Sequence, residues 1–149
     1  MTGTDLKFMR LALEQARLAG DMGETPVGAV AVWDDRLISL AHNLRESHRC
    51  ALAHAELLAI RAACEKLGGW RLHRCTLYVT LEPCPMCAGA IINARIPRVV
   101  FGARDPKAGC FGSVADFAAL PFNHKPEVVS GVLEEECGLL LREFFRALR

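Results

Sequence analysis

The segment CTLYVTLEPCPMCAGAIINARIPRVVFG, residues 75–102, decides the fold, because it holds two apolar runs separated by a short Ala-rich stretch. Residues 75–81 are rich in Thr, Leu, Tyr and Val, which is typical of a strand. Pro83 precedes a predicted helix over 84–94, near whose start proline is tolerated, and residues 98–102 predict a buried strand. Strands joined through a helix run in parallel, so the segment predicts a parallel β-α-β unit.

The flanking sequence extends this unit in both directions, because apolar residues recur at helical or strand spacing between turn residues. Further helices are predicted over 6–20, over 53–67 up to Gly68-Gly69, near 113–120 and over 134–148; further strands are predicted over 27–33, 36–42 and 127–132. The strands over 27–33 and 36–42 form an antiparallel hairpin that turns at Asp34-Asp35. The sequence therefore predicts an α/β fold of three layers (α/β/α), with a five-stranded mixed sheet covered by about five helices on its two faces.

The size and charge of the chain limit the classes of protein it can be. A length of 149 residues suits a single domain over 1–149. No apolar run reaches the roughly 18 residues of a membrane span, and residues 1–20 form an amphipathic pattern unlike a signal peptide. We therefore expect a cytoplasmic protein. The formal net charge is +1, so a polyanionic partner would have to meet a local basic patch.

Two of the seven cysteines stand apart from the others. Without a secretion signal, packing as small apolar residues is a better explanation than a disulfide framework for Cys50, Cys64, Cys75, Cys110 and Cys137. Cys84 and Cys87, by contrast, form a Cys-x-x-Cys pair at the start of a predicted helix. Free N–H groups and positive potential at a helix N-terminus favour the thiolate and hence metal binding.

His54 completes a candidate metal centre, because it stands at the start of another predicted helix, directly after a polar loop. Both helices flank strand ends, so their N-termini can converge at one edge of the sheet. Three protein ligands leave the fourth tetrahedral position to water, which is the arrangement of a catalytic zinc site. Glu56 follows two residues after His54, and a carboxylate beside such a water can accept its proton and deliver it to a leaving amine.

Other functions of the Cys-x-x-Cys pair are a redox couple or half of a structural zinc site. A structural site needs a fourth ligand, for which His73 and Cys75 are the nearest candidates. A seven-residue strand separates Cys75 from the metal end by roughly 20 Å, which argues against this alternative.

Two segments together resemble a known signature. His54-Ala55-Glu56 followed by Pro83-Cys84-Pro85-Met86-Cys87 is similar to the H-x-E…P-C-x-x-C pattern of the cytidine-deaminase-like zinc deaminases. Within that superfamily, further segments resemble the bacterial tRNA-specific adenosine deaminases. These segments are residues 26–30, Asn43, 77–84, 86–90, 98–105, Asn123-His124 and 144–146.

The resemblance implies a cytidine-deaminase-like fold, one zinc ion per subunit, and hydrolytic deamination of adenosine to inosine at the wobble position of a tRNA anticodon. Zinc-activated water would attack C6 of a flipped-out adenine, with Glu56 as the proton shuttle. Asn43 and the backbone of Ala55 would contact the target nucleotide, and Asp105 would line the RNA-binding loop. Phe145 would pack against splayed anticodon bases, although the core face of an amphipathic helix explains this residue equally well.

The resemblance also implies partners, namely the tRNA anticodon stem-loop and a second copy of the chain in a homodimer. Met86 and residues 88–92 would lie at or beside the dimer interface, or in the core. Basic residues near the expected rim would meet phosphates or form an ordinary solvated surface; they are Lys107, Arg142, Arg146 and Arg149, with Arg71 and Arg74 as further candidates.

The chain departs from the family pattern at residues 50–53, Thr25, His42 and Phe111, which are expected in the pocket wall or rim. One alternative is therefore a small-molecule deaminase of the same fold, acting on guanine, cytosine or a free nucleoside. Phe145 and Arg146 favour RNA over such a substrate. A second alternative is a non-catalytic zinc-binding subunit, which the presence of Glu56 disfavours.

Overall fold

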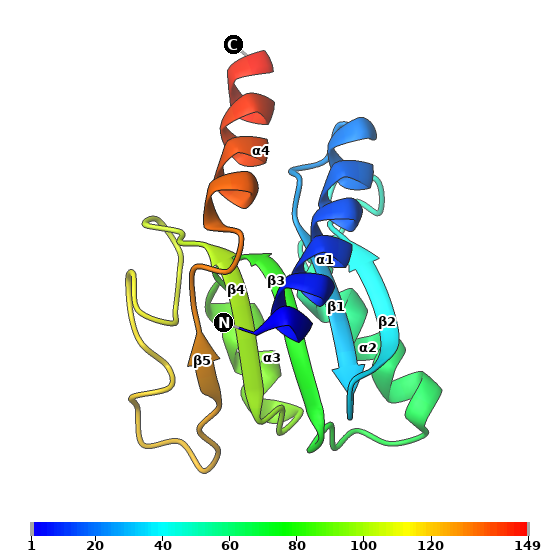
Figure 1. Ribbon diagram of the computed structural model, residues 1–149, viewed down its shortest axis with the longest axis vertical. Coiled ribbons are helices and arrows are strands. Elements are labelled where there is room, and N and C mark those ends of the chain that lie inside the picture. The colour runs from blue at the N-terminus through cyan, green and yellow to red at the C-terminus, as the bar shows by residue number, and fades with distance from the viewer. Residues whose placement is uncertain (1, 149) are drawn as a thin grey trace.

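The computed structural model describes residues 2–148, which form a five-stranded sheet between two layers of helices (Figure 1). The elements follow one another as α1 (Gly3–Asp21), β1 (Gly28–Trp33), β2 (Arg36–His42), α2 (Ala55–Leu67), β3 (Cys75–Leu81), α3 (Pro85–Asn93), β4 (Arg98–Ala103), β5 (Glu127–Val129) and α4 (Glu134–Ala147). The strand order is β2-β1-β3-β4-β5. β1 is antiparallel to β2 and β3, whereas β3 pairs with β4 and β4 with β5 in parallel. The predicted three-layer α/β fold with a mixed sheet is confirmed.

Both faces of the sheet are covered, because successive side chains of a strand point to opposite faces. Leu77 and Val79 of β3 pack into the cluster that includes α2 and α3, whereas Tyr78 packs against α1 and the start of α4. Gly28 permits the close approach of α1, since a Cβ at this position would run into the backbone of Ala12. Among residues 2–148, no helix combines the length and apolar character that crossing a membrane requires.

A buried ion pair ties α1 to the centre of the sheet. The Asp5 carboxylate accepts hydrogen bonds from both terminal nitrogens of Arg98, each at 2.8 Å, and from the Tyr78 hydroxyl at 2.7 Å. Only 1% of Asp5 is exposed, so its charge depends on these partners. The network fixes α1 over β3 and β4.

Two expectations about the region after β4 are wrong. No helix forms near 113–120; this part of the described chain makes turns and an isolated antiparallel bridge between Phe111 and Asp116. The Asp116 side chain accepts the Ala118 N–H, a local bond that competes with helix formation. The last strand, expected over 127–132, covers only Glu127–Val129 and is followed by Gly131 at φ 81°.

The cysteines divide as expected with one exception. Cys75, Cys110 and Cys137 are buried among apolar residues, and Cys64 is half-buried. Cys50 is exposed, so its assignment to the core is wrong. It lies in a series of turns between β2 and α2, where the chain has no apolar layer to pack against.

The topology brings the starts of α2 and α3 to one edge of the sheet. β2 and β3 run in the same direction, because each is antiparallel to β1. Each of these strands ends at that edge, and the chain then continues toward the N-terminus of a helix. Residues 43–54 and 82–84 make the two connections, and together they contain the predicted histidine and one predicted cysteine ligand.

Candidate metal centre and substrate pocket

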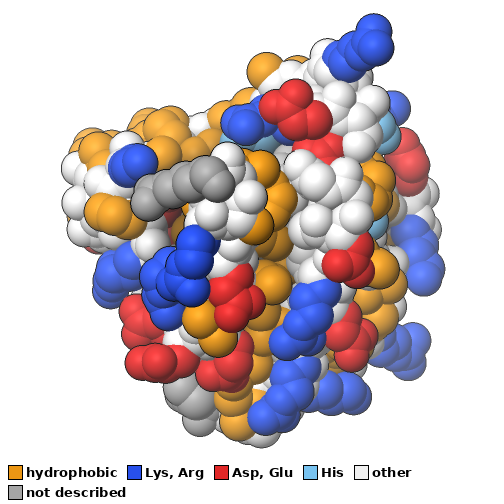
Figure 2. Space-filling model, turned by 90° about the horizontal axis from the view of Figure 1, so that it is seen from above, with side chains coloured by type: hydrophobic (Ala, Val, Ile, Leu, Met, Phe, Trp, Pro, Cys, Tyr) orange, Lys and Arg blue, Asp and Glu red, His pale blue; other side chains and the backbone are white. Residues whose placement is uncertain are grey.

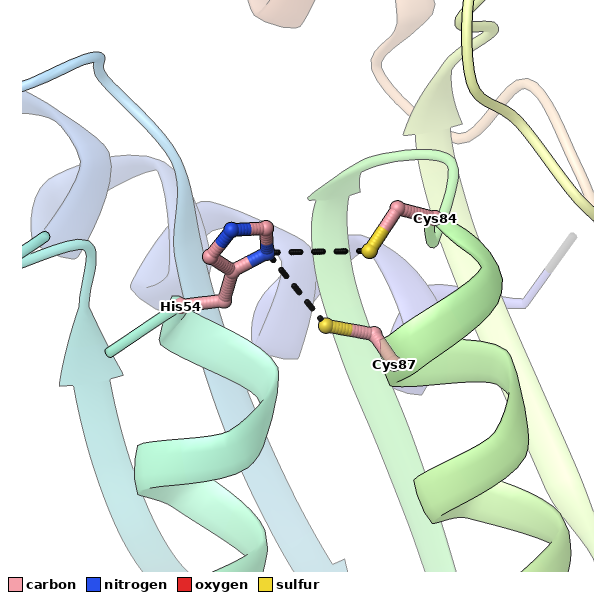
Figure 3. Close-up of side chains that lie close together, drawn as sticks. All are labelled: His54, Cys84 and Cys87. Atoms are coloured by element: carbon pink, nitrogen blue, oxygen red, sulfur yellow. Dashed lines mark hydrogen bonds between the residues drawn. The ribbon is translucent and has the colours of Figure 1, made fainter. Parts of the chain in front are cut away.

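His54 and Cys84 are the residues at which α2 and α3 begin. Each is the N-cap of its helix with extended backbone, and neither side chain caps its own helix. Pro85 occupies the first turn of α3, where its missing N–H costs nothing. The side chains therefore point across the gap between the two helix ends rather than back along them (Figure 3).

The distances within this group match the requirements of a metal site. Nδ1 of His54 lies 3.7 Å from Sγ of Cys84 and 3.5 Å from Sγ of Cys87. A tetrahedral ion with bonds of about 2.3 Å to sulfur and about 2.0 Å to nitrogen holds its ligands about 3.5 Å apart. Among residues 2–148, these three form the one group of at least three His, Cys, Asp or Glu side chains that could hold a metal ion. The donor set of one imidazole and two sulfurs suits zinc and leaves one position open.

The pKa values of the two cysteine thiols are shifted in opposite directions. The pKa of Cys84 is lowered to about 4, chiefly by a hydrogen bond from Cys87, and the pKa of Cys87 is raised in turn by the same bond. The hydrogen bond with Cys84 also raises the pKa of His54. A coordinating thiol loses its proton, so a bound metal ion would hold both Cys84 and Cys87 as thiolates.

Glu56 lies in the first turn of α2 and is 4% exposed. Burial raises the pKa of its carboxyl group to about 6. A carboxyl group with this pKa can take up and release a proton near neutral pH within the cavity. The structure thus places a buried carboxyl group in the same cavity as the candidate metal ligands.

A cavity of about 230 Å³ opens in front of this group. The volume lies below the roughly 300–1,000 Å³ of sites for drug-sized ligands, so it fits one ring system rather than a whole nucleotide. Its lining residues are Thr25, Val27, Asn43, Arg45, His54, Ala55, Glu56, Leu81, Glu82, Cys84, Asp105 and Ala108. The structure therefore gathers the predicted residues Asn43, Ala55 and Asp105 around the candidate metal centre.

Phe145 is not part of this cavity. It lies on α4, is 46% exposed, and lines a separate hollow of about 650 Å³ with Lys107, Leu141, Arg142, Arg146 and Leu148. The interpretation of Phe145 as a core residue is wrong; Phe144, the preceding residue of the helix, is the half-buried one. Lys107 joins the hollow to the loop that lines the cavity.

On the face seen in Figure 2, the Lys and Arg side chains of the described residues do not form one continuous patch. Seen from the end where α4 projects, Lys and Arg side chains alternate with acidic and apolar surface (Figure 2). Lys107, Arg142 and Arg146 share the hollow with Phe145, whereas Arg149 lies outside the described residues. Arg71 stacks on Trp70 and Arg74 pairs with Asp34 beyond the opposite ends of the strands, which excludes both from the rim of this cavity.

The residues that depart from the family pattern lie in different parts of the structure. Thr25 lines the cavity, and its carbonyl accepts a hydrogen bond from the Asn43 amide at 3.2 Å. His42 is hydrogen-bonded to Gln15 of α1 at 3.0 Å and does not line the cavity. Phe111 is buried, with its N–H on Glu82. In residues 50–53, Leu52 is 59% exposed.

Thr25 lines the cavity, as expected for the pocket wall, whereas sequence reasoning missed Arg45, Glu82 and Ala108 as lining residues. Arg45 lies two residues after Asn43, and Glu82 directly precedes Pro83; the sequence singles out both Asn43 and Pro83. That adjacency was the available signal. Residues next to a predicted metal ligand or turn lie at the same edge of the sheet as that ligand or turn. Whether their side chains point into the cavity depends on how the loops fold.

Comparison with known proteins gives concordant results. The family model of the MafB19-like deaminases matches residues 4–149. The tRNA-specific adenosine deaminase of Bacillus subtilis (strain 168) is 55% identical over 150 residues, covering 100% of this chain and 92% of that protein. The enzyme of the same name from Agrobacterium fabrum is 50% identical, covering 95% and 94%.

A solved tRNA:A34 deaminase, studied for A-to-I editing at the wobble position, superposes with a TM-score of 0.88 at 48% identity, covering 91% of this chain and 99% of that chain. The guanine deaminase of Nitrosomonas europaea superposes with a TM-score of 0.78 at 28% identity, covering 93% and 83%. The guanine enzyme is thus the more distant of the two.

Proposed function

The chain belongs to the MafB19-like deaminases and, among them, to the tRNA-specific adenosine deaminases, and from this premise we propose that residues 1–149 act as one domain that converts the wobble adenosine of a tRNA anticodon to inosine. The reaction exchanges the 6-amino group of adenine for oxygen, consuming water and releasing ammonia. The observation that carries the proposal is the convergence of His54, Cys84, Cys87 and Glu56 at one cavity.

We assign His54, Cys84 and Cys87 as ligands of one zinc ion. When bound, zinc supplies a Lewis acid that lowers the pKa of a water in its open position to about 7. Glu56 accepts a proton from the water that attacks C6 and delivers one to the departing amino group. Its burial keeps the carboxyl group out of bulk water, so protons pass between the reactants rather than to solvent.

Asn43 is held ready to orient the base. Its side-chain Nδ2 donates to the Thr25 carbonyl at 3.2 Å, and its Oδ1 accepts the Arg45 N–H at 3.1 Å. Because both ends of the amide are fixed, the remaining donor and acceptor positions have a defined direction. Ala55 is the first residue of α2, where a backbone N–H has no partner within the helix and is free for the base.

The second hollow supports an RNA substrate over a free base. Phe145 offers an exposed aromatic face, and Lys107, Arg142 and Arg146 surround it. An unpaired base can stack on the ring while its phosphates meet the cations. The cavity itself has room for the adenine alone, so the neighbouring nucleotides would occupy the hollow.

The proposed function is tested with an anticodon stem-loop that carries adenosine at the wobble position, assayed beside free adenosine, guanine and cytosine. Inosine in the stem-loop, with no turnover of the free compounds, is the expected result. Ammonia released from a free base while the RNA stays unchanged would overturn it and assign the chain to small-molecule deamination.

We also propose that the active form is a homodimer that acts in the cytoplasm, where its tRNA substrate is found. Ala88, Ile91 and Ile92 of α3 are buried in the core, but Met86 is only half-buried and Asn93 is exposed. That outer face of α3 is available to a second copy. Light scattering of the purified protein should give twice the 16.3 kDa chain mass.

A further inference from the structure

Glu82 is a buried carboxylate whose oxygens are occupied by one loop. Only 2% of the residue is exposed. Oε1 accepts the Asp105 N–H at 3.1 Å, and Oε2 accepts the N–H groups of Phe111 and Ser113 at 3.0 and 3.1 Å. The Ser113 hydroxyl also donates to Oε1. Four donors from residues 105–113 thus converge on a single anion from the segment before α3.

The loop is wrapped closely enough around Glu82 to require a glycine. A Cβ at Gly109 would overlap the Glu82 carboxyl group, so the loop backbone there lies directly against the anion. The Cys110 N–H donates to the Pro83 carbonyl at 2.9 Å, which holds the same stretch to the next residue of the segment. Outside these contacts the loop has little regular structure, so the carboxylate organises it.

The loop that Glu82 holds contains residues that line the cavity and the hollow beside Phe145. Asp105 and Ala108 line the cavity, and Lys107 lines the hollow beside Phe145. The Asp105 carboxylate in turn accepts the N–H groups of Lys107 and Ala108, at 3.0 and 3.3 Å. Glu82 therefore sets where one wall of the cavity stands relative to Cys84, two residues further along the chain.

We propose that Glu82 is a positioning residue for the deamination, whose carboxylate holds residues 105–113 as a preformed wall against the target nucleotide. The proposal rests on the proposed function for the identity of that nucleotide. Charge-assisted hydrogen bonds of this kind are stronger than neutral ones, and each donor left without its acceptor inside the protein is destabilising. A loop fixed before binding loses less conformational entropy when the substrate arrives.

Glu24, which directly precedes the cavity-lining Thr25, provides a matched comparison. It is 1% exposed, accepts the N–H groups of Glu46 and Ser47 at 3.1 and 2.6 Å, and also accepts the Ser47 hydroxyl. It thus holds the loop that contains Arg45, while making no hydrogen bond to residues 105–113. The two acids have the same chemistry and burial but act on different loops.

The test uses Glu82→Gln in the zinc-loaded protein, with Glu24→Gln as the control. Glutamine keeps the shape but turns one acceptor oxygen into a donor that faces N–H groups. We expect hydrogen exchange at the Phe111 and Ser113 amides to accelerate at least about tenfold, with exchange at Glu46 and Ser47 unchanged. Glu24→Gln should show the reverse pattern. The zinc content of both variants should stay at one per chain.

Kinetics on the stem-loop supply the second readout. The loop binds the substrate but moves no proton, so Glu82→Gln should raise KM about tenfold and leave kcat within about twofold. Gly109→Ala keeps Glu82 but pushes the loop away, so it should reproduce both the faster amide exchange and the raised KM. It is the alternative test variant if Glu82→Gln does not fold. Ser113→Ala removes one donor of the four and should have a smaller effect in the same direction.

Unchanged exchange at Phe111 and Ser113 in both Glu82→Gln and Gly109→Ala would overturn the proposal, as would a loss confined to kcat. A wild-type protein that leaves the stem-loop unchanged would instead overturn the proposed function. In that case the exchange pattern would still decide whether Glu82 holds the loop, because this measurement needs no RNA.

Discussion

Nδ1 of His54 lies 3.5 Å from Sγ of Cys87, although the two residues are 33 positions apart and stand at the starts of different helices. No chain segment joins them directly; the parallel course of β2 and β3 brings the two helix ends together. A histidine and a cysteine at this distance, with a second sulfur beside them, could hold one metal ion. The fold thus assembles the candidate metal centre from residues that are distant in sequence.

The first prediction is that Cys87→Ala abolishes stoichiometric zinc binding and lowers the thermal midpoint. Two remaining ligands cannot hold zinc tightly, and the half-buried His54 and Cys84 lose a partner. Elemental analysis and thermal unfolding measure the two effects. Cys75→Ala is the matched control, because Cys75 is also buried but lies at the far end of β3. It should cost on the order of 1 kcal/mol and keep a full zinc complement.

The second prediction separates the proton carrier from the metal. Glu56→Ala should keep one zinc per chain and lose kcat by at least about 10²–10⁴-fold, the usual contribution of general acid–base catalysis. The residue is not one of the three predicted ligands, so its removal leaves the metal in place. Single-turnover deamination of the stem-loop and elemental analysis make the comparison. Activity retained within tenfold would contradict the role of Glu56.

The sequence was sufficient for the family, the layer architecture and a proposed ligand set, because each depends on local patterns. The spacing of apolar residues indicates the strands and helices. His-x-Glu and Cys-x-x-Cys can be recognised at the helix starts from the local sequence alone. The region after β4 was not predictable in the same way. Its conformation depends on Glu82, which lies 23 residues before Asp105 and 31 before Ser113. In place of the helix expected near 113–120, Ser113 bonds to Glu82 and Ala118 bonds to Asp116. Glu82 is too far away in the sequence for motif reasoning to connect it with this loop.

The third prediction concerns the exposed aromatic ring on α4. Phe145→Ala should raise KM for the stem-loop about tenfold or more, because stacking an unpaired base contributes about 1–3 kcal/mol. Stability should change little, since the ring is 46% exposed. Leu139→Ala is the control, because Leu139 lies on the same helix with the same exposed fraction but does not line the hollow. Equal effects of the two variants would show that Phe145 makes no specific contact.

The fourth prediction uses salt to identify phosphate contacts. Arg142→Gln and Arg146→Gln should each reduce the slope of log affinity against log salt by about 0.7–0.9, the amount expected for one lost phosphate contact. Anisotropy titrations of a labelled stem-loop with guanosine at the wobble position measure binding without turnover. Arg71→Gln changes the net charge equally but lies on Trp70, away from the hollow. Its slope should equal that of the wild type.

The last prediction concerns the pH dependence of stability. The Arg98 guanidinium, hydrogen-bonded to Asp5, lowers the pKa of this carboxyl group from 3.8 to about 2. The folded state therefore binds the Asp5 proton more weakly than the unfolded state does. The resulting stability, on the order of 2 kcal/mol, is fully present above about pH 4 and is lost as the pH falls toward 2.

Asp5→Asn removes this titration while keeping the shape of the side chain. Urea unfolding should find the variant less stable than the wild type at pH 7, with a difference that shrinks between pH 4 and pH 2. Acid also protonates the candidate metal ligands, but it does so in both proteins, so the difference between them isolates Asp5. A difference that stays constant from pH 7 to pH 2 would mean that the loss comes from packing or hydrogen bonding. The ion pair with Arg98 would then contribute nothing that depends on charge.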